Sequence, residues 1–219
     1  MDRTVHGGWE RRIRMKEICR YMGMREQDTT ESFLAEIERQ LSRLLEVSRV
    51  RSYWEIFPIL RQGAGDGVRF YLGPMAVYSR DLDRNLQGCD QAAVFGATLG
   101  LEADRLIYRL EKTALGEAAI TDACAAAAIE AVCDELCHGL KKEAMVRSMA
   151  TRPRFSPGFG DFTLEYQPLI FGMLQLSKRT GISLTSGGMM IPCKSVTAVV
   201  GFQREAAEDG LPSEEAARR

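Results

Sequence analysis

The chain has 219 residues, with 29 Lys and Arg against 30 Asp and Glu, and 45% of its residues are hydrophobic. A chain of this length buries about 70% of the surface that its unfolded form exposes, enough for one sizeable core without disulfide or metal staples. The balanced charge argues against a general nucleic-acid or membrane-surface binder, and no apolar run approaches the ~18 residues that a membrane helix needs.

Both ends of the chain look dispensable for folding. Residues 1–12 combine glycines with scattered charge, which predicts a flexible N-terminal extension, and residues 204–219 have little to bury, which predicts a mobile charged tail. A single domain over residues 13–203 remains. Because the N-terminus lacks the apolar stretch of a signal peptide and the six cysteines suit reduced thiols, we expect a cytoplasmic protein.

The first half of the chain alternates helix and strand signals. Asp28 and Glu31 have capping-box spacing, and the apolar residues that follow at helical spacing predict a helix from Thr29 to Ser48. Further on, the residue patterns predict a strand at 53–57 that stops at Pro58, a loop at 63–67, a strand at 68–72, a short helix at 82–91 and a strand at 92–99.

The second half carries longer helices and then strands. The expected elements are helices at 101–112 and 120–144, a helix that starts near Leu164 or Pro168 and is capped by Gly181, and strands at 182–185 and 195–202. In the last strand the alternation places Val196, Ala198, Val200 and Phe202 on one face. Strand pairs beside long helices predict an α+β domain with a largely antiparallel sheet.

Several common kinds of active site are excluded. Only His6 and His138 are present, neither near a plausible Ser or Cys partner, and no Walker-type, Gly-x-Ser-x-Gly or His-Glu-x-x-His motif occurs. Cys133 and Cys137 lie one helical turn apart and could touch one metal ion, but His138 points elsewhere and further ligands are missing. The thiols therefore fit core packing better than a metal site.

The segment Arg152–Asp161 reads RPRFSPGFGD, and its prolines and glycines forbid regular structure. A rigid loop that presents an arginine fork and aromatic rings is a good platform for a carboxylate and a planar heterocycle. A tight connection into the next helix, with Asp161 as its N-cap and the phenylalanines as core residues, explains the residues equally well. From the residues alone, both interpretations stay open.

The segment Leu184–Val196 contains Ser186-Gly187-Gly188 between two strand signals. Glycines there let backbone approach closely, either to a ligand or within a simple turn. The turn is at least as good an explanation as a ligand contact.

These two segments together resemble the activation domain of cobalamin-dependent methionine synthase, especially its freestanding form. The resemblance is carried by Arg154-x-x-Pro157-Gly158-Phe159, by Ile182–Thr185 and by Met190-x-Pro192-x-x-Ser195-Val196, with support from Thr98–Gly100 and the 122–136 helix. It spans roughly residues 15–203 and is strongest over residues 90–202.

The resemblance implies a C-shaped α+β domain with a twisted, mainly antiparallel sheet flanked by helices and with S-adenosylmethionine in a shallow groove. Such a domain docks on the cobalamin-binding domain of a methionine synthase, which carries the cobalamin. There it supports the reductive methylation of inert cob(II)alamin, with flavodoxin or a ferredoxin as electron donor. The protein's own work is then to position the cofactors.

The resemblance also assigns roles to single residues. Arg154 matches the arginine that holds the methionine carboxylate of S-adenosylmethionine, Glu130 matches a glutamate near the sulfonium, and Ser156 matches a backbone contact to the adenosine. Gly158 allows a close backbone approach, and Phe159 stands where the family often has a tyrosine near the cobalt face. Glu130 as an ordinary solvated helix residue is the competing explanation.

The sequence departs from the family at Phe159, which keeps the ring without the hydroxyl. It departs again where the fused synthases read Leu-Thr-Glu-Ser-aromatic, since this chain has Leu184-Thr185-Ser186-Gly187-Gly188. Gly187 and Gly188 are kept as groove candidates. Two alternatives follow: an activator of another corrinoid methyltransferase, and a non-catalytic interaction module that has lost the cofactor.

Overall fold

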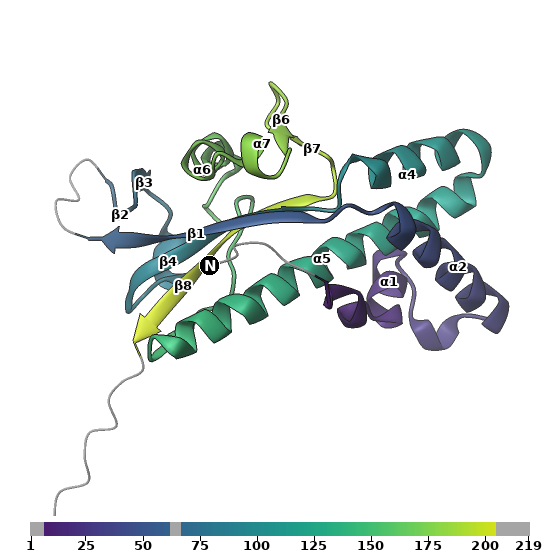
Figure 1. Ribbon diagram of the computed structural model, residues 1–219, viewed down its shortest axis with the longest axis horizontal. Coiled ribbons are helices and arrows are strands. Elements are labelled where there is room, and N and C mark those ends of the chain that lie inside the picture. The colour runs from purple at the N-terminus through teal and green to yellow at the C-terminus, as the bar shows by residue number, and fades with distance from the viewer. Residues whose placement is uncertain (1–6, 62–66, 205–219) are drawn as a thin grey trace, which may run out of the picture.

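The computed structural model describes residues 7–61 and 67–204 and is built on a six-stranded antiparallel sheet (Figure 1). From edge to edge the strands are β3 (Met75–Val77), β2 (Phe70–Leu72), β1 (Arg51–Leu60), β4 (Cys89–Thr98), β8 (Ser195–Arg204) and β5 (Met149–Thr151). A separate hairpin pairs β6 (Ser183–Leu184) with β7 (Met190–Ile191). The predicted α+β class and the mainly antiparallel sheet are confirmed.

Helices cover both faces of this sheet. The α-helices are α1 (Met15–Tyr21), α2 (Glu31–Val47), α3 (Arg80–Asn85), α4 (Leu101–Thr113), α5 (Leu115–Val146), α6 (Gln167–Leu174) and α7 (Leu176–Arg179), and the short 3-10 turns are η1 (Trp9–Arg12), η2 (Glu26–Asp28) and η3 (Leu164–Tyr166). Figure 1 shows α5 crossing one face of the sheet, with α6 and α7 over the other. Helices α1, α2 and α4 pack on α5.

The alternation of side chains along the strands divides the interior into two cores. On β4, Phe95 packs in the core on the α5 side, and its neighbour Val94 packs in the core beneath α6. On β8 the predicted face is confirmed, since Val196, Ala198, Val200 and Phe202 all belong to the α5 side. Both faces of the central strands are therefore buried.

Helix α5 has 32 residues, a length of about 48 Å. Its middle is rich in alanine, and Ala123, Ala125, Ala127, Ala128 and Ala131 are all at most 5% exposed. Small side chains on several sides let the sheet and the neighbouring helices approach the helix axis closely. The helix is therefore the central element of its core and not a surface helix with one apolar stripe.

Residues 9–12, which the sequence places in the N-terminal extension, form the 3-10 turn η1 in contact with α5. Trp9 is 5% exposed and packs in the α5 core, and Arg12 forms an ion pair with Glu135 of α5 at 2.5 Å. These contacts attach residues 9–12 to the α5 core, and the domain boundary at residue 13 stays a prediction. Residues 1–6 and 205–219 lie outside the described residues, as does most of the predicted 63–67 loop.

The start of α2 differs from the capping-box prediction. Thr30 is the N-cap, with its hydroxyl accepting from the backbone N–H of Phe33, while Asp28 closes the preceding 3-10 turn. Both residues are good N-caps, so the sequence alone does not decide between neighbouring candidates.

Strand β1 continues through Pro58 to Leu60, although Pro58 was predicted to end it. The Pro58 carbonyl accepts a hydrogen bond from the backbone N–H of Gly73. Proline has no backbone N–H to donate, and here only its carbonyl is needed, so the strand can continue through it. At this point β1 exchanges its partner, pairing with β4 up to Pro58 and with β2 at Ile59 and Leu60.

The remaining differences concern short elements. Strand β4 starts at Cys89, because the helix predicted to Gln91 ends at Asn85 and Gly88 adopts a left-handed turn with φ +77°. Gly181 follows α7 instead of capping α6. Strands β3, β5 and β7 have two or three residues each and were not predicted, since so short a strand is stabilised by its partner rather than by its own pattern.

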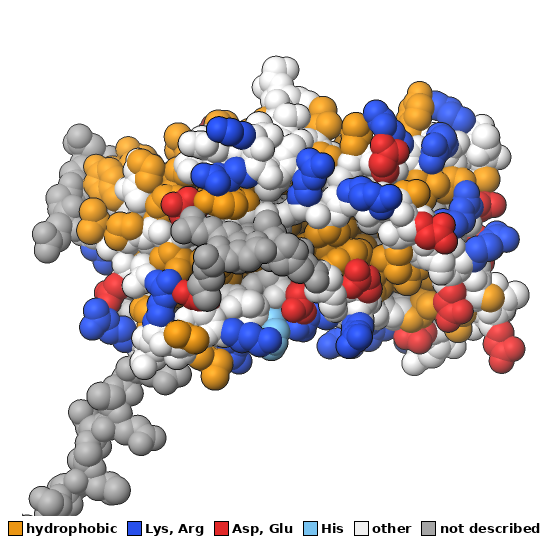
Figure 2. All heavy atoms as spheres, viewed as in Figure 1, with side chains coloured by type: hydrophobic (Ala, Val, Ile, Leu, Met, Phe, Trp, Pro, Cys, Tyr) orange, Lys and Arg blue, Asp and Glu red, His pale blue; other side chains and the backbone are white. Residues whose placement is uncertain are grey.

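The surface agrees with the balanced composition. Figure 2 shows acidic and basic side chains interspersed over the face that it draws, with hydrophobic side chains between them. Among the described residues, no helix combines the length and the hydropathy that crossing a bilayer requires.

The close contact between the sheet and α7 at Gly96 gives a stability prediction. A Cβ on Gly96 would lie 2.7 Å from Cδ2 and 2.8 Å from Cδ1 of Leu176, which is fully buried. Gly96→Ala should therefore lower the free energy of unfolding by about 1–3 kcal/mol, as overpacking does. Gly139→Ala is the matched control: nothing lies within 4 Å of its Cβ, and an exposed helix position should gain about 0.5–1 kcal/mol. Urea unfolding measures both, and equal effects would contradict the close contact.

Candidate functional site

The segment 152–162 lies along the outer edge of β8, beyond the short strand β5. The backbone N–H of Arg152 donates to the carbonyl of Gly201, and Phe155 exchanges backbone hydrogen bonds of 2.9 and 2.8 Å with Val199. The segment therefore continues the sheet as an irregular edge. This pairing holds the side chains on either side of Phe155 in fixed positions.

Asp161 fixes the far end of the same segment to helix α3. Its carboxylate accepts from the hydroxyl of Ser79 and from the backbone N–H groups of Arg80 and Asp81, and its own N–H donates to Asp81. Asp161 was considered as a cap for the helix that follows it, but it caps a helix some 80 residues earlier. The segment is thus attached to two parts of the fold.

Glycines make this attachment possible. Gly160 has φ +52°, and a Cβ there would lie 2.1 Å from a carboxylate oxygen of Asp81. Gly158 has φ +100°, a conformation that favours glycine, and its N–H donates to the carbonyl of Phe162.

A cavity of about 170 Å³ opens between this segment and α5. We call it the Arg154 cavity; it is lined by Glu130, Arg154, Phe155, Ser156, Phe159 and Val196. Four of the predicted site residues therefore meet in one place: Glu130 from α5, and Arg154, Ser156 and Phe159 from the segment. Arg154 and Glu130 are 24 positions apart in the chain.

Arg154 and Glu130 form an ion pair within the cavity. Asp134, one helical turn beyond Glu130, lies 3.8 Å from the same guanidinium nitrogen. The other terminal nitrogen, Nη1, is buried and has no hydrogen-bond partner among the described residues. Both carboxylates interact with the same nitrogen, so the hydrogen-bonding capacity of the guanidinium is only partly used. A buried donor without a partner costs free energy.

The Arg154 side chain stays protonated. Burial by itself lowers the pKa of this guanidinium, but the neighbouring Cys133, Glu130, Cys137 and Asp134 raise it, and the net pKa lies above the ordinary value. Arg154 therefore presents a permanent positive charge in the cavity.

The two thiols on this part of α5 are packed next to the arginine. Burial raises the pKa of Cys133 above its ordinary value and raises the pKa of Cys137 to about 11. All six cysteines are free thiols, and within residues 7–61 and 67–204 no group of His, Cys, Asp and Glu side chains is arranged to hold a metal ion. Cys133 is fully buried and Cys137 partly buried, and both pack in the α5 core.

Phe159 lines the cavity and is 65% exposed, an unusual position for a large apolar ring. Its ring meets Phe155 edge-on with centroids 6.4 Å apart, and Phe155 in turn contacts Phe162 at 6.2 Å. The half-buried Phe155 and the buried Phe162 lie behind this ring, and most of the Phe159 side chain stays exposed.

Gly187 and Gly188 are not among the residues that line the Arg154 cavity. They lie in the turn of the β6–β7 hairpin, where the N–H of Gly188 donates to the carbonyl of Thr185. A Cβ on Gly188 would meet nothing within 4 Å. The simple turn explains these glycines, and a ligand role for them stays a prediction.

Sequence reasoning missed two features of the site. Asp134 was not singled out, although its position four residues after Glu130 places both carboxylates on one helix face. The attachment of Asp161 to α3 had no sequence signal, because it joins residues about 80 positions apart.

Comparison with known proteins identifies the fold. The sequence matches no protein-family model and no curated protein. Among solved structures, the chain is similar to the MetH reactivation domain bound to AdoHcy, with a TM-score of 0.55 and 18% sequence identity, over 81% of this chain and 69% of that chain. The resemblance to the methionine synthase activation domain is thereby confirmed at the level of the fold.

The attachment of Asp161 to α3 leads to a prediction about pH. Hydrogen bonds from Ser79 and from the N–H groups of Arg80 and Asp81 lower the pKa of Asp161 from 3.8 to about 2. Since the folded pKa is the lower one, the stabilisation is present above about pH 4 and disappears as the pH falls towards 2. Asp161→Asn should therefore lower the thermal midpoint at pH 7, with a difference from the unaltered protein that shrinks below pH 4.

Thermal unfolding followed by circular dichroism from pH 7 to about pH 2 measures this difference. Asp28→Asn is the control, because Asp28 is exposed and pairs through its side chain with the exposed Arg25 alone among the described residues. A pH-independent difference for Asp161→Asn would contradict the charge-assisted cap.

Proposed function

We propose that the Arg154 cavity binds S-adenosylmethionine. The observation that carries this proposal is the convergence of Glu130, Arg154, Ser156 and Phe159 on one cavity, although they come from a helix and from a distant loop. The similar fold of a domain whose solved structure holds AdoHcy supports it further.

The charges of the cavity fit the methionine end of this ligand. Arg154 offers the buried Nη1 donor to the ligand carboxylate, and Glu130 offers its negative charge to the sulfonium. Binding then exchanges one internal ion pair for two pairs with the ligand. Asp134 stays beside the guanidinium and offsets part of the cost of opening the internal pair.

The size of the cavity indicates how much of the ligand it encloses. Cavities that bury a whole drug-sized ligand measure about 300–1,000 Å³, whereas this one measures about 170 Å³. The methionine end therefore lies inside, and the adenosine lies over Ser156 on the open surface, where a partner protein covers it.

We further propose that the chain is a freestanding reactivation subunit for a cobalamin-dependent methionine synthase that lacks its own activation domain. In this role S-adenosylmethionine supplies the methyl group for cob(II)alamin on the partner's cobalamin-binding domain, and flavodoxin or a ferredoxin supplies one electron. The exposed Phe159 ring faces the corrinoid and excludes water, and it cannot donate a hydrogen bond. The chain's own contribution is to bind and orient.

Binding of S-adenosylmethionine is the first test of this proposed function. Calorimetric titration with S-adenosylmethionine should show saturable binding that Arg154→Ala weakens by about tenfold or more, because a charge-assisted contact worth about 1.5–3 kcal/mol is lost. Arg105→Ala is the control, since Arg105 is an exposed helix residue paired with Glu102. If the unaltered chain binds only when a corrinoid partner is present, the open half of the site is completed by that partner.

A chain that binds neither alone nor with a partner would contradict the proposal. Such a result would favour an interaction module whose Arg154–Glu130 pair has become purely structural.

The second prediction separates Phe159 from the ligand-binding residues. Phe159→Ala should change the affinity for S-adenosylmethionine less than Arg154→Ala does, but it should slow methylation of cob(II)alamin on a synthase that lacks its activation domain. The methylation is followed by the absorption spectrum of the cobalamin. If Phe159→Ala loses binding and methylation equally, Phe159 belongs to the ligand site alone. If the unaltered chain is active only with another corrinoid methyltransferase, that enzyme is the partner.

A further inference from the structure

A second and larger hollow lies on the other side of helix α5. We call it the Glu143 hollow; it has a volume of about 460 Å³ and is lined by Trp54–Pro58, Asp90, Gln91, Glu143 and Arg147. The Arg154 cavity adjoins β8 and its outer edge, whereas this hollow adjoins β1 and β4 near the C-terminal end of α5. The two recesses therefore share a helix but no lining residue.

Glu143 is the unusual residue of the hollow, because it is 7% exposed. Its Oε1 accepts from Nε of Arg147 at 2.9 Å and from Nη2 at 2.5 Å. Its Oε2 is buried and has no hydrogen-bond partner among the described residues. A buried carboxylate oxygen without a donor is costly, and the last side-chain torsion of a glutamate varies broadly, so rotation of the carboxylate can present an oxygen to a ligand in the hollow.

Arg147 offers the opposite chemistry at the same place. Its side chain is 42% exposed, and the described residues give its guanidinium no partner except Glu143. A guanidinium carries five N–H donors, so several remain for an anion. The pair thus presents an acceptor and a set of donors side by side.

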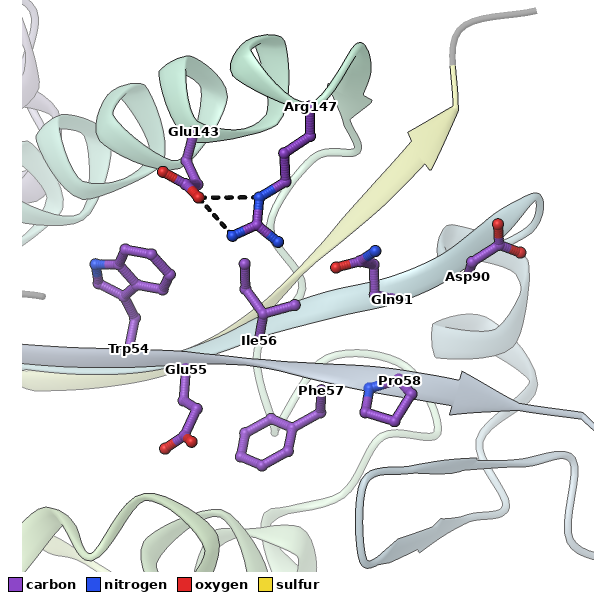
Figure 3. A pocket seen from close by; sticks show the side chains of 9 residues that line it. All are labelled: Trp54, Glu55, Ile56, Phe57, Pro58, Asp90, Gln91, Glu143 and Arg147. Carbon is purple, nitrogen blue, oxygen red and sulfur yellow. Dashed lines mark hydrogen bonds and ion pairs between the residues drawn. The ribbon is translucent and has the colours of Figure 1, made fainter. Parts of the chain in front are cut away.

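The opposite wall of the hollow is apolar. Figure 3 shows Trp54 and Ile56 pointing from β1 towards Glu143 and Arg147 on α5, whereas Glu55 and Phe57 point to the other face of the sheet. Gln91 points to the α5 side next to them, and Asp90 forms an ion pair with Arg204 at 3.1 Å. One side of the hollow therefore suits hydrocarbon, and the other suits two opposite charges.

We propose that the Glu143 hollow binds a free α-amino acid with an apolar side chain. The ammonium group donates to Oε2 of Glu143, the carboxylate accepts from the open N–H groups of Arg147, and the side chain packs on Trp54 and Ile56. A zwitterion satisfies both halves of the ion pair at once, which a simple cation or anion does not. The proposal is independent of S-adenosylmethionine binding in the Arg154 cavity.

The experiment titrates the full chain with L-leucine, L-methionine and L-phenylalanine. Binding is followed by calorimetry and by tryptophan fluorescence, because Trp54 lines the hollow while Trp9 is buried with the helices. We expect saturable binding below about 10 mM, and at least about tenfold weaker binding of the methyl esters and of the N-acetyl derivatives. Trp54→Phe should abolish the fluorescence change.

Glu143→Gln should weaken binding of the amino acid by about tenfold or more while leaving binding of S-adenosylmethionine unchanged. Glu135→Gln is the matched control, since it alters another ion pair on the same helix. If Glu143→Gln does not fold, Arg147→Met should give the same loss. Arg154→Ala should leave amino-acid binding intact, so the two sites fail or succeed separately.

Three results would overturn the proposal. They are no saturable binding of any of the three amino acids, equal binding of the esters and N-acetyl derivatives, and loss of amino-acid binding in Arg154→Ala. The last result would place the amino acid in the Arg154 cavity.

Discussion

The close packing of α5 on the sheet is the constraint on which the rest of this structure depends. Alanines in the middle of the helix let β4, β8 and the helices α1, α2 and α4 approach it from several sides. Any polar side chain on the buried sides of this helix must be paired or must border a recess, because an unpaired buried polar group costs free energy. The Arg154 cavity and the Glu143 hollow each lie where α5 carries an acid, Glu130 in the first and Glu143 in the second.

The two recesses follow one physical scheme. In each, a glutamate of α5 pairs with an arginine, and one atom of the pair stays buried without a partner among the described residues: Nη1 of Arg154 in the first and Oε2 of Glu143 in the second. In each recess the internal ion pair offsets the charge of the buried group. A ligand that carries both charges can exchange with the pair without leaving either residue uncompensated.

Long and strongly patterned elements were predictable from the sequence, whereas several of the shortest strands were not. Helices α2 and α4 and the buried face of β8 follow from apolar spacing, because each packs through one continuous face, and α5 follows from the regular spacing of apolar residues over a long segment. Strands β3, β5 and β7 exist because a neighbouring strand pairs with them, and β1 continues through Pro58 because only an acceptor is needed there. The burial of Trp9 was not predicted either, because a single apolar residue among charged neighbours forms no periodic pattern.

The sequence by itself determined which residue types are available for chemistry: the arginine, serine and ring of the 154–159 segment, Glu130, and the fold that their order resembles. Only the tertiary structure decided which of these meet. In the folded chain Glu130 pairs with Arg154, and Asp134 lies beside the same guanidinium. Gly187 and Gly188 lie in a hairpin turn, and Asp161 caps a helix some 80 residues earlier in the chain. The physical reason is that local spacing sets faces and turns, whereas contacts between distant segments depend on how the packed layers align them.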